Sequence, residues 1–89
     1  MVKVGEYSFE IIENVRDAFS EDDFVSLFTE YFYDYDYIVG DYAYNKLRLK
    51  GFYNDNNKKS KDFNKMSNKS LYIKNNCAYN CKYFVLKKI

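Results

Sequence analysis

The chain has 89 residues, of which 47% are hydrophobic and 21% aromatic, and its formal net charge is +1. This composition excludes a disordered chain, and the length allows one domain of residues 1–89 but no multidomain enzyme, because domains usually have about 100–150 residues. Histidine, the commonest general base, is absent, and we expect neither an enzyme with catalytic residues nor a bound cofactor or metal.

The first elements that the sequence predicts are a β-hairpin and a helix. Residues 2–14 alternate apolar and polar side chains around Gly5 and Glu6, a pattern typical of two strands joined by a tight turn. Ser20 precedes an acidic run, which is an N-cap signal, and apolar residues then recur at helical spacing from Phe24 to Phe32. We expect one helix here that covers a sheet with its apolar stripe.

Two strands should follow the helix. Residues 35–41 have strand composition and end at Gly40 and Asp41, a pair typical of turns, so we expect Asp41 to hydrogen-bond within a turn. Residues 47–53 supply the returning strand, with leucines on one face and Arg48, Lys50 and Phe52 on the other. Asp36 and Asp41 are five residues apart and should lie on opposite faces, which argues against a paired-carboxylate site.

The last third of the chain is less regular. Residues 54–68 are rich in Asn, Lys, Ser and Asp without periodicity, and we expect a mobile polar loop there. A short helix is expected at 70–77, and residues 82–89 are apolar on both faces, which favours a central strand. The predicted fold is therefore α+β: a mainly antiparallel sheet of four to five strands covered by one main helix, plus a short second helix.

Charge is distributed unevenly along the chain. Residues 1–44 carry two basic and eleven acidic side chains, a balance of −9, whereas residues 45–89 carry twelve basic and two acidic ones, a balance of +10. Such asymmetry suggests a polyanion-binding surface, although the two halves can also pair their charges within one sheet. The sequence contains neither a signal-peptide pattern nor an apolar run that could span a bilayer, so we expect a cytoplasmic protein without a membrane partner.

Cys77 and Cys81 form a C-x3-C motif. Two thiols without histidine do not complete a zinc site in one chain, although two chains could supply four thiolates, and nearby lysines could acidify a redox pair. The alternative that we favour is a pair of buried, reduced thiols, because the cytosol keeps thiols free.

Two hypotheses for function follow from the charge pattern. Basic residues interleaved with aromatics on a strand are typical of single-stranded RNA binding, and this pattern predicts an RNA or ribosome contact made by Arg48, Lys50, Phe52, Lys58, Lys59 and Lys61. The alternative is a protein-protein adaptor or a homodimer that uses an acidic helix face made by Glu21, Asp22 and Glu30.

Three segments give the chain a family resemblance: YDYIVGD at 35–41, LRLKGFY at 47–53 and CAYNCKYFVL at 77–86. Together they resemble the signature blocks of the YutD-like family, small uncharacterised proteins of low-GC Gram-positive bacteria and their relatives. The chain departs from that pattern at Tyr42-Ala43, where the family tends to have Trp-Gly, and at Asn80, where it tends to have glycine. The resemblance implies a fold over nearly the whole chain and a bacterial cytosolic setting, and it carries no catalytic residues.

Overall fold

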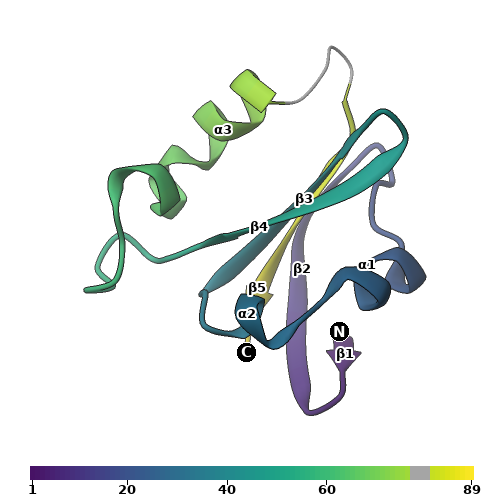
Figure 1. Cartoon of the computed structure of the whole chain (residues 1–89), viewed down its shortest axis with the longest axis horizontal. Helices are drawn as coiled ribbons and strands as arrows, with labels where there is room; N and C mark the ends of the chain where they lie inside the picture. The colour runs from purple at the N-terminus through teal and green to yellow at the C-terminus, as the bar shows by residue number, and fades with distance from the viewer. Residues whose placement is uncertain (77–80) are drawn as a thin grey trace.

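The computed structural model describes residues 1–76 and 81–89, and it confirms the α+β class predicted from the sequence (Figure 1). Five antiparallel strands form one sheet in the order β1-β2-β5-β3-β4, so that the last strand of the chain is central, as predicted. The strands are β1 (Val2–Val4), β2 (Tyr7–Val15), β3 (Tyr37–Ala43), β4 (Lys46–Phe52) and β5 (Tyr83–Lys88). The α-helices are α1 (Glu21–Leu27), α2 (Glu30–Tyr33) and α3 (Lys69–Asn76). None of the helices in these ranges is long and apolar enough to cross a membrane.

The expected turn at Gly40-Asp41 is wrong, because β3 continues through both residues. The chain reverses instead at Tyr44 and Asn45, whose φ angles of 53° and 63° are those of a tight type I′ hairpin turn. Gly40 is needed inside the strand because a Cβ atom there would lie 2.2 Å from Cζ of Phe84. A contact with a distant part of the chain therefore overrides the local turn signal of Gly-Asp.

The single helix expected after Ser20 is two short helices. The Ser20 hydroxyl accepts a hydrogen bond from the amide of Asp23, which confirms the predicted N-cap. The helix then ends at Leu27, since the C-cap residue Phe28 is extended with a ψ of 135°, and α2 begins after Thr29. Thr29 stands at the break between the two helices. Threonine is a poor helix former but is common at the N-cap position, so it favours the end of one helix and the start of the next. The bend lets both Phe28 and Phe32 pack against the core.

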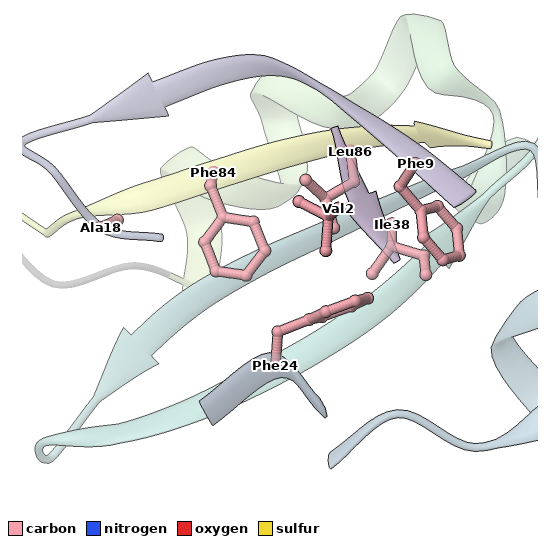
Figure 2. Packing of buried hydrophobic residues seen from close by; sticks show 7 residues of the cluster. All are labelled: Val2, Phe9, Ala18, Phe24, Ile38, Phe84 and Leu86. Atoms are coloured by element: carbon pink, nitrogen blue, oxygen red, sulfur yellow. The ribbon is translucent and has the colours of Figure 1, made fainter. Parts of the chain in front are cut away.

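The face of the sheet beneath α1 and α2 carries the larger hydrophobic core (Figure 2). Its centre is aromatic: the ring of Phe24 meets the ring of Phe9 edge-on at a centroid distance of 5.7 Å and that of Phe84 at 6.4 Å. The opposite face has a smaller core of Val39, Phe52 and Val85, on which α3 packs through side chains that include Tyr72. Helices therefore cover the sheet on both faces.

Residues 54–68 contain local structure that their composition did not predict. Two 3-10 turns, at Asp62–Asn64 and Met66–Asn68, lead into α3. The segment is joined to the end of β4, because the amide of Tyr53 donates to the carbonyl of Asn64 (2.7 Å) and its carbonyl accepts from the amide of Met66 (2.8 Å). This bridge beside β4 brings the polar segment and α3 next to the predicted basic strand.

Candidate functional site

The structure places Arg48 opposite Asp41 on the neighbouring strand, on the face that α3 covers. Nη2 of Arg48 donates to Oδ2 of Asp41 at 2.5 Å, and this hydrogen bond raises the pKa of the guanidinium above its usual value. The Asp41 side chain is fully buried, whereas that of Arg48 is 42% exposed. Asp41 is therefore the buried partner of Arg48 and not the turn residue that the sequence predicted.

The two oxygens of the Asp41 carboxylate differ in their hydrogen bonding. Within the described part of the chain, Oδ1 of Asp41 is buried and accepts no hydrogen bond. The nearby Tyr72 has a raised pKa, caused first by burial and then by the negative charge of Asp41. The negative charge beneath α3 thus depends on Arg48 for compensation.

Lys50 lies among three aromatic rings. Its Nζ atom is 5.4 Å from the ring centroid of Phe52 and 5.5 Å from those of Phe63 and Tyr72, all within cation-π range. Phe52 itself is fully buried in the smaller core, so its ring does not face solvent. Of the predicted face of Arg48, Lys50 and Phe52, only the two cations reach the surface, and the exposed ring beside them is Phe63.

A groove of about 410 Å³ opens between β4 and α3, beside Lys50. Phe63 and Leu71 are 68% and 56% exposed there, so the groove presents two large apolar side chains to solvent. We call this depression the β4-α3 groove; its lining residues are Lys50, Asp62, Phe63, Asn68, Leu71, Tyr72 and Asn75.

A second groove, of about 380 Å³, lies along the outer side of β4. Its lining includes residues 48–51 of the strand together with Tyr31 and Tyr35 from the α2 side and Tyr72 from the α3 side. Side chains from both faces of the sheet contribute, so this groove straddles the edge of the sheet. We call it the β4 edge groove.

One of the predicted loop lysines, Lys59, is held by an acidic side chain from the first half of the chain. Nζ of Lys59 donates to Oδ1 of Asp34 at 2.7 Å, and the Tyr53 hydroxyl donates to Oδ2 of the same carboxylate at 2.5 Å. These two hydrogen bonds lower the pKa of Asp34, and burial, followed by the bond to Asp34, raises the pKa of Tyr53. Lys58 and Lys61 are exposed. Lys59 therefore fastens the segment after β4 to the chain before β3.

Opposite charges of the two chain halves meet in the fold. Within the described ranges, ion pairs that join an acid of the first half to a base of the second include Asp41 to Arg48, Asp34 to Lys59 and Glu13 to Lys69. The charge asymmetry thus serves in part to hold the halves together. This is the alternative to a polyanion-binding surface that the sequence left open.

The acidic residues of the alternative interface lie on the other side of the sheet. Glu21 and Asp22 are exposed in the first turn of α1, and Glu30 is exposed in the first turn of α2. Acidic side chains at helix N-termini are stabilised by the helix dipole, so their position has a structural explanation. These three acidic residues are not among the lining residues of the β4-α3 groove or the β4 edge groove.

Cys81 is disulfide-bonded, so the free thiol expected at this position is wrong. The expectation followed from the compartment, which the sequence does not determine. Cys77 lies outside the described residues. Across residues 1–76 and 81–89, no three Cys, Asp or Glu side chains gather in a way that could hold a metal ion.

Sequence reasoning missed four residues of this region. Asp41 could have been paired with Arg48 had Asn45, a residue that tolerates positive φ, been taken as the turn signal. Phe63, Leu71 and Tyr72 gave no local signal, because the 3-10 turn at Asp62–Asn64 and the packing of α3 bring them beside Lys50.

Comparisons with known proteins agree with this architecture. A family model described as "Putative antitoxin YutD-like" matches residues 3–87. The chain is 42% identical to "Putative antitoxin YutD" of Bacillus subtilis (strain 168) over 89 residues, which cover all of this chain and 98% of that protein. It is also similar to the solution NMR structure of protein yutD from B. subtilis, with a TM-score of 0.84 and 42% identity over 100% of this chain and 81% of that one.

Proposed function

Because the chain belongs to the YutD-like family, as its sequence motifs predicted, we propose that it is a non-enzymatic protein that binds another protein through the surface beside β4. The name of the Bacillus relative supports a binding role, since an antitoxin is a molecule that counteracts a toxin. A small protein can do so by occupying a surface of its target, without chemistry of its own.

The main support for the proposal is that large, exposed apolar side chains gather on the surface beside β4. Among the described residues, leaving aside the chain ends and the hairpin tip at Tyr44, the most exposed large apolar side chains are Phe63 (68%), Tyr31 (66%) and Leu71 (56%). Phe63 and Leu71 line the β4-α3 groove, and Tyr31 lines the β4 edge groove. Aromatic residues and arginine are enriched at the centre of protein interfaces.

RNA binding is the competing interpretation, and the geometry favours it less. Sheet platforms for single-stranded RNA stack bases on exposed rings, whereas Phe52 is buried and α3 covers its face. One of the predicted phosphate-binding cations, Lys59, is engaged in an ion pair with Asp34. Lys58 and Lys61 remain exposed.

The test is crosslinked capture from a lysate of the source organism, with each sample divided into nuclease-treated and untreated halves. We expect wild-type protein to retain its partner after nuclease treatment, and Leu71→Glu to retain at least roughly tenfold less, because the charge would enter an apolar contact. Val25→Glu is the matched control, since Val25 is an exposed apolar residue on α1, on the opposite side of the sheet from α3, and lines neither groove beside β4.

Three outcomes are informative. Loss of the partner from Leu71→Glu alone supports the proposal. Equal loss from Leu71→Glu and Val25→Glu would show that the contact is not made beside β4. Partners that disappear with nuclease treatment would replace the proposal with the RNA interpretation, and Lys58 and Lys61 would then be the first residues to change.

A further inference from the structure

From the open edge of β4 we infer that the partner contributes an extended segment, alternating acidic and apolar side chains, that pairs with β4 as a sixth strand. This inference rests on the proposed function, because it names the chemistry of the segment that the protein binds. It starts from the position of β4 at the end of the strand order. The other end is β1, which is only three residues long.

The direction of the backbone groups follows from the hairpin. In a two-residue hairpin the closing residues, here Ala43 and Lys46, exchange hydrogen bonds, and bonding alternates along the strands from there. The even-numbered residues of β4 therefore direct their amide and carbonyl groups toward β3. The odd-numbered residues, Leu47, Leu49 and Gly51, direct theirs outward.

The other end of β4 gives the same result independently. The amide and the carbonyl of Tyr53 both bond the segment around Lys65, which runs parallel beside it as an isolated β-bridge on the outer side. Because Tyr53 is odd-numbered, its outward-directed amide and carbonyl follow the same alternation as the odd-numbered residues of β4. The edge thus already pairs with one extended segment of its own chain, and this pairing stops at Tyr53.

The remaining outward groups are open. Within the part of the chain that the structure describes, no backbone hydrogen bond joins the outward groups of Leu47, Leu49 or Gly51 to another segment. An edge of this kind is a template for strand addition, in which main-chain bonds supply affinity and alternate side chains supply specificity.

The β4 edge groove fits such a strand on both sides. Side chains on one face of an added strand would meet Tyr31 and Tyr35, whose hydroxyls are hydrogen-bonded to each other at 2.8 Å. Those on the other face would meet Arg48 and Lys50. Alternation of apolar and acidic side chains complements these two walls.

A second copy of the chain is a poorer occupant. Antiparallel pairing of two β4 edges would set Lys46, Arg48 and Lys50 of one copy against the same residues of the other, and like charges on neighbouring strands are destabilising. Basic side chains on an edge strand also protect it from self-association. The same charges attract an acidic strand.

The direct test uses purified protein and a capped synthetic peptide, Glu-Val-Glu-Val-Glu-Val, with Lys-Val-Lys-Val-Lys-Val as its control. Amide hydrogen exchange is followed residue by residue by NMR. We expect the acidic peptide to slow exchange at Leu47, Leu49 and Gly51 at least roughly tenfold, while the amides of Arg48 and Lys50, already bonded to β3, change little. Absence of protection at the three outward amides, or equal protection by the basic peptide, would overturn the inference.

A pair of variants tests the edge in the natural complex. Leu49→Pro removes the outward N–H, whereas Leu49→Ala keeps it and loses a similar amount of apolar side chain. We expect crosslinked capture of the nuclease-resistant partner to fall roughly tenfold or more in Leu49→Pro relative to Leu49→Ala, because a partner carbonyl would lose its donor. Thermal unfolding of both variants checks that each is folded.

The two proposals fail in different ways. A nuclease-resistant partner that is lost from Leu71→Glu but captured equally by both Leu49 variants would leave the proposed function standing and overturn strand addition. A partner that nuclease removes would overturn the proposed function, and the exchange measurement with the two peptides would still decide whether the β4 edge accepts an acidic strand.

Discussion

Replacing Arg48 by methionine should cost more stability than neutralising Asp41, although both changes remove the same ion pair. Asp41 is fully buried and the Arg48 side chain is 42% exposed, so loss of Arg48 leaves a buried charge without compensation. Removing one partner from a buried pair costs about 3–5 kcal/mol, and we take about 3 because Arg48 is partly solvated. Asp41→Asn loses a charge-assisted hydrogen bond, about 1.5 kcal/mol, and leaves a cation that can turn toward water.

Urea unfolding at pH 7 of the wild type, the two single variants and the double variant measures this asymmetry. A domain of this size has a free energy of unfolding of roughly 4–13 kcal/mol, so a loss of about 3 kcal/mol is a large part of it. In a parallel thermal melt the same loss should lower Tm by roughly 12–24 °C. The double variant should be less destabilised than the sum of the singles. Lys46→Met, an exposed position on the same face of β4, is the control and should change stability by less than about 0.5 kcal/mol. A larger cost for Asp41→Asn than for Arg48→Met, or additive costs, would refute the reasoning.

Three further predictions concern the fold around this pair. Gly40→Ala should destabilise by about 2–3 kcal/mol in urea unfolding, because its Cβ would overlap the ring of Phe84; a change below about 0.5 kcal/mol would contradict the packing. Tyr44→Asn should raise Tm by a few degrees, since Tyr44 is exposed at φ 53° and asparagine tolerates that conformation better; an unchanged or lower Tm would contradict the turn assignment. Burial, then the hydrogen bond with Tyr31, raises the pKa of Tyr35 to about 12. The unfolded tyrosine ionises near pH 10, so stability should be complete below that pH and fall as pH rises toward about 12, and Tyr35→Phe should lose less over this window in the same assay. If the wild type and Tyr35→Phe lost stability equally as the pH rises, the buried, hydrogen-bonded environment of Tyr35 would be contradicted.

Local patterns predicted most of the elements, because they depend on neighbouring residues. Alternation located the strands and correctly placed Arg48, Lys50 and Phe52 on one face, and the Ser20 cap located the start of α1. Gly40-Asp41 was wrongly predicted to be a turn because the pair has turn composition. Glycine is required at this position because the ring of Phe84, which is distant in sequence, leaves no room for a Cβ atom.

The candidate site was predicted only in part for the same physical reason. Which residues share a strand face is local, but what covers that face is not. Helix α3 has no strong apolar stripe in its sequence, yet it supplies Tyr72, which packs near Phe52 at a centroid distance of 5.7 Å. The bridge between Tyr53 and Lys65 brings this helix into place, and no periodicity marks such a contact. The sequence therefore indicated the cations of the site but not its exposed rings.

The edge of β4 also shows why a small aromatic-rich domain can bind without a deep pocket. A chain of this size buries only about 60–65% of its unfolded surface, so some of its large apolar side chains must remain outside the core. Here Tyr31, Phe63 and Leu71 flank one open strand edge from both faces of the sheet, and Lys50 is common to both grooves. Polar replacements at these positions should therefore leave folding nearly unchanged while weakening partner binding, whereas Arg48→Met should reduce both, because its ion pair is part of the fold and its side chain is part of the groove.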